Sequence, residues 1–117
     1  MRMWMVQPEQ MCRQHLLGEH VELHMLVGTI RRHKSLQGYV DNGLIEPLSI
    51  HSRHEALVEE MTRRGYSHHS PIPGDQELRR LLGVYSWKIA SAKVDQDKAH
   101  RELCLRCPAC WWKRKRP

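Results

Sequence analysis

The stretch MRMWMVQPEQMCRQHLLGEHVELHMLVGTIRRH, residues 1–33, carries the strongest structural signal in the chain. Its first six residues are mostly apolar and include Trp4, which predicts an ordered N-terminal arm rather than a frayed end. Pro8 and Glu9 suit the first turn of a helix, so a helix is expected from about Pro8 to Arg32. On a helical wheel the core stripe consists of Cys12, Leu16, Leu23, Val27 and Ile30.

A second stripe lies beside this core face, and it consists of Met11, His15, Gly18, Glu22 and Thr29. Glycine costs helix stability, so the value of Gly18 is the space that it leaves for another backbone or a ligand. His15 and Glu22 lie on either side of that gap, two turns apart. A third side of the helix, which could meet phosphates, carries Arg13, His20, His24 and Arg31.

The histidines and glutamates of this helix allow three interpretations. They could form a solvated polar face. Alternatively, His20 and His24 are four residues apart and could chelate zinc. The residues between them do not make the H-E-x-x-H arrangement, and the sequence offers no evident third ligand. The third interpretation is an acid/base site in which Glu22 is the carboxylate beside the gap at Gly18.

The remainder of the chain predicts two further helices and two loops. Residues 35–49 contain two glycines and a proline and are expected to form a loop. HSRHEALVEEMTRRGY (residues 51–66) predicts a second helix, with a capping box from Ser52 to Glu55 and a stop at Gly65. A loop follows, and a third helix is expected from Asp75 to Leu103, with Gly83 as the candidate break. The expected fold is all-α: a single domain over residues 1–117, with three main helices in one compact layer, an ordered arm and long loops.

Composition favours a folded protein with a polyanionic partner. The chain is 40% hydrophobic and 27% charged and has a net charge of +6. This charge points to nucleic acid, although small basic domains can also lack such a partner. No apolar run is long enough to span a membrane, and no signal-peptide pattern is present. Four cysteines without a disulfide pattern favour a cytoplasmic protein, which we expect to be a monomer associated with the nucleoid.

The C-terminal segment CLRCPACWWKRKRP (residues 104–117) combines thiols, tryptophans and positive charge. Cys104, Cys107 and Cys110 have zinc-ligand spacing, with Cys12 or a histidine as the fourth ligand; the alternative is a set of reduced thiols. The tryptophans could stack on bases while the following cations meet phosphates, or one tryptophan could close the core and the rest could be a solvated end.

The arm and the first two helices together resemble the pyrimidine-dimer DNA glycosylase family. The matching residues are Arg2, Gln14, His15, Leu16, Glu22, Gly28, Arg31, Arg32 and His33. ALVEEMTRRGYSHHS (residues 56–70) is similar to the family's Glu-rich helix, which ends in a basic pair, a glycine and an aromatic residue. CLRCPAC is similar to the same region of bacterial members.

This resemblance implies a DNA repair glycosylase with abasic-site lyase activity on damaged double-stranded DNA, and no cofactor. It places the nucleophile at the α-amino group of Met1, which forms a Schiff base, and a charge-stabilising and proton-transferring carboxylate at Glu22. The bulky Arg2 predicts that Met1 is retained. The expected DNA contacts are Arg2, Gln14, His15, Arg31, Arg32, Trp111, Trp112, Lys113 and Arg114. The family's phage member has arginines at the positions of Val21 and Met25, so the lesion is open between pyrimidine dimers, another lesion and abasic sites.

Two rival functions follow from the same residues. A non-catalytic DNA-binding module would bind DNA with steep salt dependence and form no covalent adduct. A zinc-dependent nuclease would use the histidines or the cysteines and would be sensitive to chelators.

Overall fold

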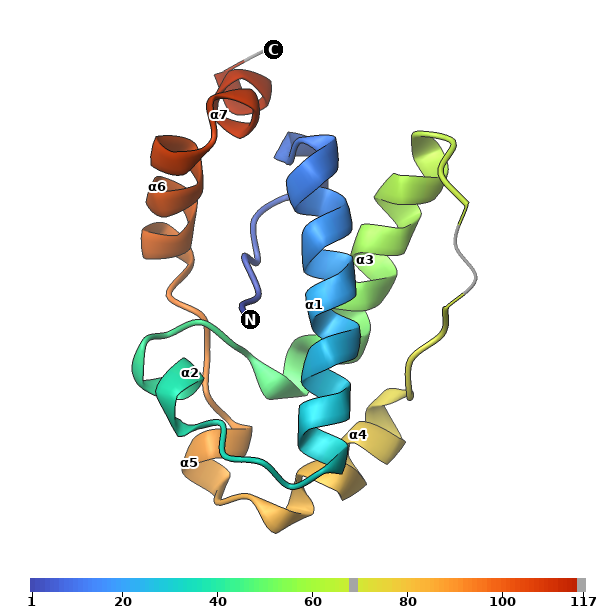
Figure 1. Cartoon of the computed structure of the whole chain (residues 1–117), viewed down its shortest axis with the longest axis vertical. Helices are drawn as coiled ribbons and strands as arrows, with labels where there is room; N and C mark the ends of the chain where they lie inside the picture. The colour runs from blue at the N-terminus through green and yellow to red at the C-terminus, as the bar shows by residue number, and fades with distance from the viewer. Residues whose placement is uncertain (68–69, 116–117) are drawn as a thin grey trace.

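Helices make up all the regular structure in the computed structural model, which describes residues 1–67 and 70–115, with side chains as far as Trp111 (Figure 1). The α-helices are α1 (Arg13–Arg31), α2 (Gln37–Asp41), α3 (Ile50–Arg63), α4 (Asp75–Leu81), α5 (Trp87–Ala90), α6 (Gln96–Arg106) and α7 (Pro108–Lys115). Short 3-10 helices are η1 (Pro8–Gln10), η2 (Pro47–Ser49) and η3 (Leu82–Val84). The all-α prediction is therefore confirmed.

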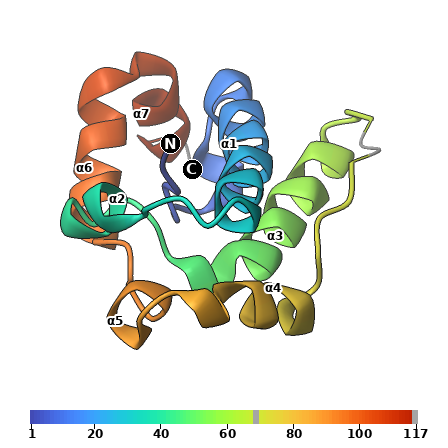
Figure 2. The same cartoon turned by 60° about the horizontal axis from the view of Figure 1, so that its bottom comes forward.

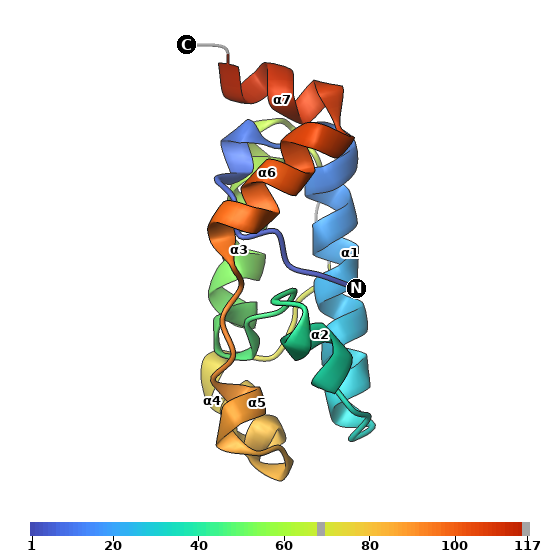
Figure 3. The same cartoon turned by 90° about the vertical axis from the view of Figure 1, so that its left-hand side faces the viewer.

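Three helices, α1, α3 and α6, are the longest, with 19, 14 and 11 residues. The molecule is a slab of 43 × 30 × 17 Å, and its thin edge is visible in Figure 3. The N-terminal arm (residues 1–6) lies between α1 and α6 (Figures 1 and 2). In the described residues no helix is long and apolar enough to cross a bilayer.

The first long helix begins later than the sequence pattern predicts. Pro8 starts only the short η1, and α1 begins at Arg13 after an extended N-cap at Cys12. The break lets the Met11 side chain become fully buried, and it turns the Cys12 N–H toward the Cys110 sulfur, 3.2 Å away. The predicted core stripe holds downstream of this break, because Leu16, Leu23, Val27 and Ile30 are all buried.

The beginning of α3 also differs from the prediction. The helix starts at Ile50, directly after η2, and no side chain caps it. Ser52 lies inside its first turn and donates to the Ser49 carbonyl, so the Ser52–Glu55 capping box is wrong. Complete burial of Ile50 accounts for the earlier start. The predicted stop is confirmed, because Gly65 has a φ of +84° and Tyr66 donates back to the Met61 carbonyl.

The segments expected to be one loop and one helix are both subdivided. Residues 35–49 contain α2 and η2, anchored by the buried Leu36 and Ile45. The expected third helix is divided into α4, η3, α5 and α6, with the predicted break at Gly83 falling in η3. Ser86 and Asp95 cause the later restarts, because each side chain accepts from a backbone N–H and caps the next helix.

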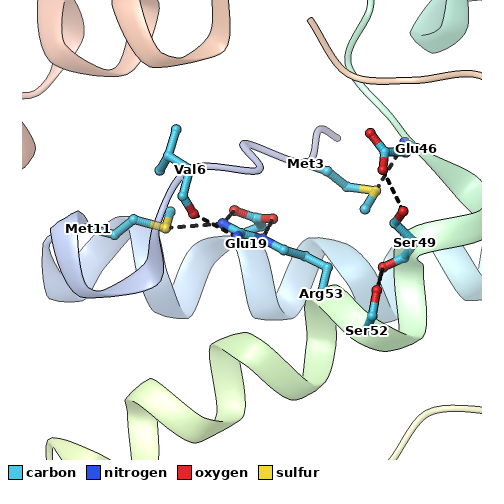
Figure 4. A network of polar contacts seen from close by, with 8 residues as sticks. All are labelled: Met3, Val6, Met11, Glu19, Glu46, Ser49, Ser52 and Arg53. Carbon is cyan, nitrogen blue, oxygen red and sulfur yellow. Dashed lines mark hydrogen bonds and ion pairs between the residues drawn. The ribbon is translucent and has the colours of Figure 1, made fainter. Parts of the chain in front are cut away.

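The ordered N-terminal arm predicted from residues 1–6 is present. Met3, Trp4 and Val6 are buried, and the Met3 N–H donates to the Leu44 carbonyl at 2.7 Å. Arg53 of α3 donates to the Val6 carbonyl at 2.7 Å and makes two hydrogen bonds to Glu19 of α1, at 2.6 and 2.9 Å (Figure 4). One buried arginine thus ties α3, α1 and the arm together.

Candidate active site

A pocket of about 370 Å³ opens between the arm, α1 and α6. The arm contributes Arg2 and Trp4, and α6 contributes Arg106. The α1 wall consists of Gln14, His15, Gly18, Glu19 and Glu22. The structure therefore brings five of the residues singled out from the sequence, Arg2, Gln14, His15, Gly18 and Glu22, to one pocket. Arg106 lies between the C-terminal cysteines, and no sequence signal distinguished it.

The two glutamates of this wall have different surroundings. The Glu19 side chain is fully buried, and both of its oxygens accept hydrogen bonds from Arg53. Glu22 lies one turn further along α1 and is half-buried. Within the described residues, no hydrogen bond or ion pair engages the Glu22 carboxylate. Glu19 is therefore committed to the fold, whereas Glu22 is available to a molecule in the pocket.

Gly18 forms an open section of the same wall. Apart from its own helix backbone, no described atom lies within 4 Å of the place where a Cβ would stand. The sequence predicts that this space receives another backbone or a ligand. The arm does not fill it, so the gap belongs to the pocket.

The start of the chain lies beside the middle of α1 (Figures 1 and 3). Met1 is half-buried against the core, and Arg2, which directly follows it, lines the pocket. Arg2 stacks over the Trp4 ring at 3.7 Å and donates to Glu102 of α6 at 2.7 Å. These contacts hold the first residues of the arm at the edge of the pocket.

The ion pair between Arg2 and Glu102 sets the charge state of the α6 side. The hydrogen bond from Arg2 lowers the pKa of Glu102; burial opposes this, and the positive charges of Arg2, Arg106 and Lys98 add to the lowering. Glu102 is therefore a carboxylate that positions Arg2. It is not a proton carrier near neutral pH.

Two further DNA contacts predicted from the sequence, Arg31 and Arg32, lie away from this pocket. Arg31 and Arg32 are exposed at the far end of α1, about 14 Å along the helix axis from Glu22, and Arg31 lies 4.0 Å from Glu77. Trp111 is 44% exposed on α7. The side chains of Trp112, Lys113 and Arg114 lie outside the described residues.

A family model described as pyrimidine dimer DNA glycosylase matches residues 1–73. The chain belongs to the pyrimidine dimer DNA glycosylase family. Comparisons with curated proteins and with solved structures gave no match. The matched residues include α3 as well as the arm and α1, and the arm and α1 supply all the residues that line the pocket except Arg106. As a member of a DNA glycosylase family, the protein is a DNA repair enzyme that acts on DNA.

The prediction that His20 belongs to a face of α1 that could meet phosphates is wrong. His20 is buried rather than exposed, and its ring packs against His24 and His54, with centroids 4.9 Å from each. The three histidines are close enough to hold a metal ion together. The sequence suggested His20 and His24 as a pair, but His54 is on α3 and only helix packing brings it to them.

A second group of side chains that could hold a metal ion adjoins the same pocket. It consists of Cys12, His15, Cys107 and Cys110, whose ligand atoms all lie within 4.8 Å of one another. Cys104, which the sequence analysis grouped with Cys107 and Cys110, is not part of it. Cys104 lies inside α6, about one helical turn before Cys107, which is the C-cap of that helix. Cys107 and Cys110 flank the start of α7. The two predicted alternatives for a fourth ligand, Cys12 and a histidine, are both present.

The thiols in this group have contrasting environments. Burial raises the pKa of the Cys110 thiol to about 12; the hydrogen bond from the Cys12 backbone N–H opposes this rise, and the side-chain hydrogen bonds with Cys12 and Cys107 add to it. Burial also opposes ionisation of Cys107, but hydrogen bonds from Cys110, Cys12 and the Ala109 backbone outweigh it and lower the pKa of Cys107.

Proposed function

We propose that this glycosylase removes a damaged pyrimidine with the α-amino group of Met1 and then breaks the DNA strand as an abasic-site lyase. The observation that carries the proposal is the pocket. It presents the unengaged Glu22 carboxylate opposite an arm whose first residues are held at the pocket edge by the contacts of Arg2. A nucleophile on a frayed terminus could not be held at the reacting carbon.

In the first step the neutral amine attacks C1′ of the damaged nucleotide, and the C1′–N bond breaks as the base leaves with a proton. α-Amines are far less basic than lysine side chains, so a useful fraction is neutral near pH 7. Opening of the sugar ring gives a Schiff base between Met1 and C1′, with the ring oxygen taking up a proton. The Glu22 carboxylate stabilises the positive charge that develops on the sugar.

In the second step a proton leaves C2′ and the C3′–O3′ bond breaks, which cuts the strand. Glu22 is placed to carry this proton. Hydrolysis of the Schiff base by water then returns the free amine. The pocket supports both steps, because Arg2 and Arg106 supply positive charge near a DNA backbone while Glu22 supplies the negative charge that the sugar cation needs.

We propose pyrimidine dimers as the lesion, on the strength of the family. The surface of α1 next to Glu22 is apolar, with Val21 and Met25 54% and 53% exposed. These side chains can contact bases or sugars but cannot bind phosphates. C1′ is shielded in a stacked duplex, so the enzyme must displace a nucleotide, at a cost of a few kcal/mol that is smallest at damaged positions.

Borohydride trapping tests the proposed chemistry. The untagged protein incubated with abasic or dimer-containing duplex and borohydride should yield a covalent adduct on the peptide that contains Met1. A tag ahead of Met1 should abolish trapping while DNA binding persists, and the same tag at the C-terminus is the control. Equal trapping with a blocked terminus would refute the assignment of Met1. DNA binding without any adduct would favour the non-catalytic module.

A further inference from the structure

All four ligand atoms of the cysteine–histidine group lie within 4.8 Å of one another, and three of their separations are close to those of a tetrahedral metal site. The Cys12 sulfur lies 3.7 Å from the Cys107 sulfur and 3.3 Å from Nδ1 of His15, and the Cys110 sulfur lies 3.7 Å from the same Nδ1. With Zn–S bonds of about 2.3 Å and Zn–N bonds of about 2.0–2.1 Å, a tetrahedral zinc separates two sulfurs by about 3.8 Å and a sulfur and a nitrogen by about 3.6 Å. The observed distances differ from these by a few tenths of an ångström.

The type and number of ligands favour zinc with a structural role. Three thiolates and one imidazole are a common structural zinc set, and they complete the four-ligand shell without leaving an open position for substrate. Two backbone groups support the sulfurs: the Cys12 N–H points to the Cys110 sulfur at 3.2 Å, and the Cys110 N–H points to the Cys107 sulfur at 3.4 Å. Such second-shell donors orient thiolates and offset part of their charge.

The four ligands come from opposite ends of the chain. Cys12 and His15 belong to the start of α1, whereas Cys107 and Cys110 flank the start of α7. Cys107 lies 95 residues beyond Cys12 in the sequence. α7 packs against η1, so a metal ion here would join the C-terminal helix to the entrance of α1. Closing so long a loop constrains the unfolded chain, which adds to the stability of the folded one.

We propose that Cys12, His15, Cys107 and Cys110 bind one structural zinc ion that holds α7 against the start of α1. On binding, the three thiols lose their protons to solvent and four metal–ligand bonds form, three to sulfur and one to Nδ1 of His15. His15 also lines the active-site pocket, edge-on to Trp4 with ring centroids 5.9 Å apart. The zinc therefore fixes one wall of the pocket, and His15 acts as a metal ligand rather than through Nδ1 as a DNA contact.

Metal analysis of purified variants tests this site independently of activity. Untagged protein prepared without chelators should contain about one zinc per chain, and Cys107→Ser and Cys110→Ser should contain almost none. Cys104→Ser is the matched control, because Cys104 is half-buried in the same segment but lies outside the group, and it should retain the zinc. Absence of zinc from the wild type, or equal zinc in all variants, would overturn the proposal. So would zinc that is lost only on His54→Asn, which would assign it to the three histidines.

Two measurements on the wild-type chain do not depend on the variants folding. Cobalt(II) in place of zinc should give the intense visible bands of a tetrahedral site and sulfur-to-metal charge-transfer absorption for three thiolates. Intact mass under non-reducing conditions should correspond to four thiols. A mass lower by two hydrogens would show a disulfide in place of the site, and cobalt spectra without thiolate absorption would place the metal elsewhere; either result would overturn the proposal.

Discussion

The pair Glu19 and Glu22 offers a sharp test of the division between fold and chemistry in the pocket wall. Both are glutamates of α1, one turn apart, and both line the pocket. Glu19→Ala should destabilise the protein severely, because it leaves the Arg53 guanidinium, only 6% exposed, without its carboxylate. Glu22→Ala is the same change on the same helix, but no buried charge loses its partner.

The size of the difference follows from the burial of the ion pair. Removing one partner of a buried pair costs about 3–5 kcal/mol, a large share of a total stability of about 5–15 kcal/mol. An unfolding entropy of about 2.1 cal/mol/K per residue gives about 0.25 kcal/mol/K for a chain of this length, so Tm should fall by about 12–20 °C. For Glu22→Ala the change should stay within about 0.5 kcal/mol, or about 2 °C.

Thermal unfolding followed by circular dichroism, with urea titration as a second measure, provides the comparison. A double-mutant cycle with Arg53→Ala should give a double variant that loses less than the sum of the two single changes, since neither charge is then left alone. Equal stability losses for Glu19→Ala and Glu22→Ala would refute the reasoning. Activity assays should show the separate role of Glu22. Glu22→Gln should remain folded and bind DNA but lose most of its turnover.

Three further predictions concern the pocket and the tail. Gly18→Ala should raise stability by up to about 1 kcal/mol in urea titrations, because the methyl group meets no described atom, yet weaken DNA binding by projecting into the pocket. The pKa of Glu102 is lowered, so its pair with Arg2 stabilises the protein above the ordinary glutamate pKa and is lost as pH falls; the stability gap between wild type and Glu102→Gln should close on acidification. Neutralising Lys113, Arg114, Lys115 and Arg116 should flatten the slope of log K against log salt by up to about 3–4 on duplex DNA, and an unchanged slope would mean that they contact no phosphates.

The sequence alone predicts the features that depend on local pattern. The apolar residues of α1 recur with the helical period, so the buried stripe from Leu16 to Ile30 could be predicted without knowing its partners. Gly65 marks the end of α3 because a residue with positive φ is needed there, and that need is local. The arrangement of Gly18, Glu22 and the arm was also recognisable, because the family likeness covers the same residues.

Only the tertiary structure decides the features that depend on distant partners. Glu19 and Glu22 look alike in the sequence, and Arg53 on another helix makes one of them structural. The single helix expected after Asp75 is divided because Ser86 and Asp95 cap new helices. This segment contains several polar residues that could act as caps, and tertiary packing determines which of them do. Cys12 and Cys107 are 95 positions apart, and no local signal pairs them. Cys104 shares the two-residue spacing of the cysteines, but Cys12 and His15 are the residues that lie beside Cys107 and Cys110, because α7 packs against η1 at the entrance of α1.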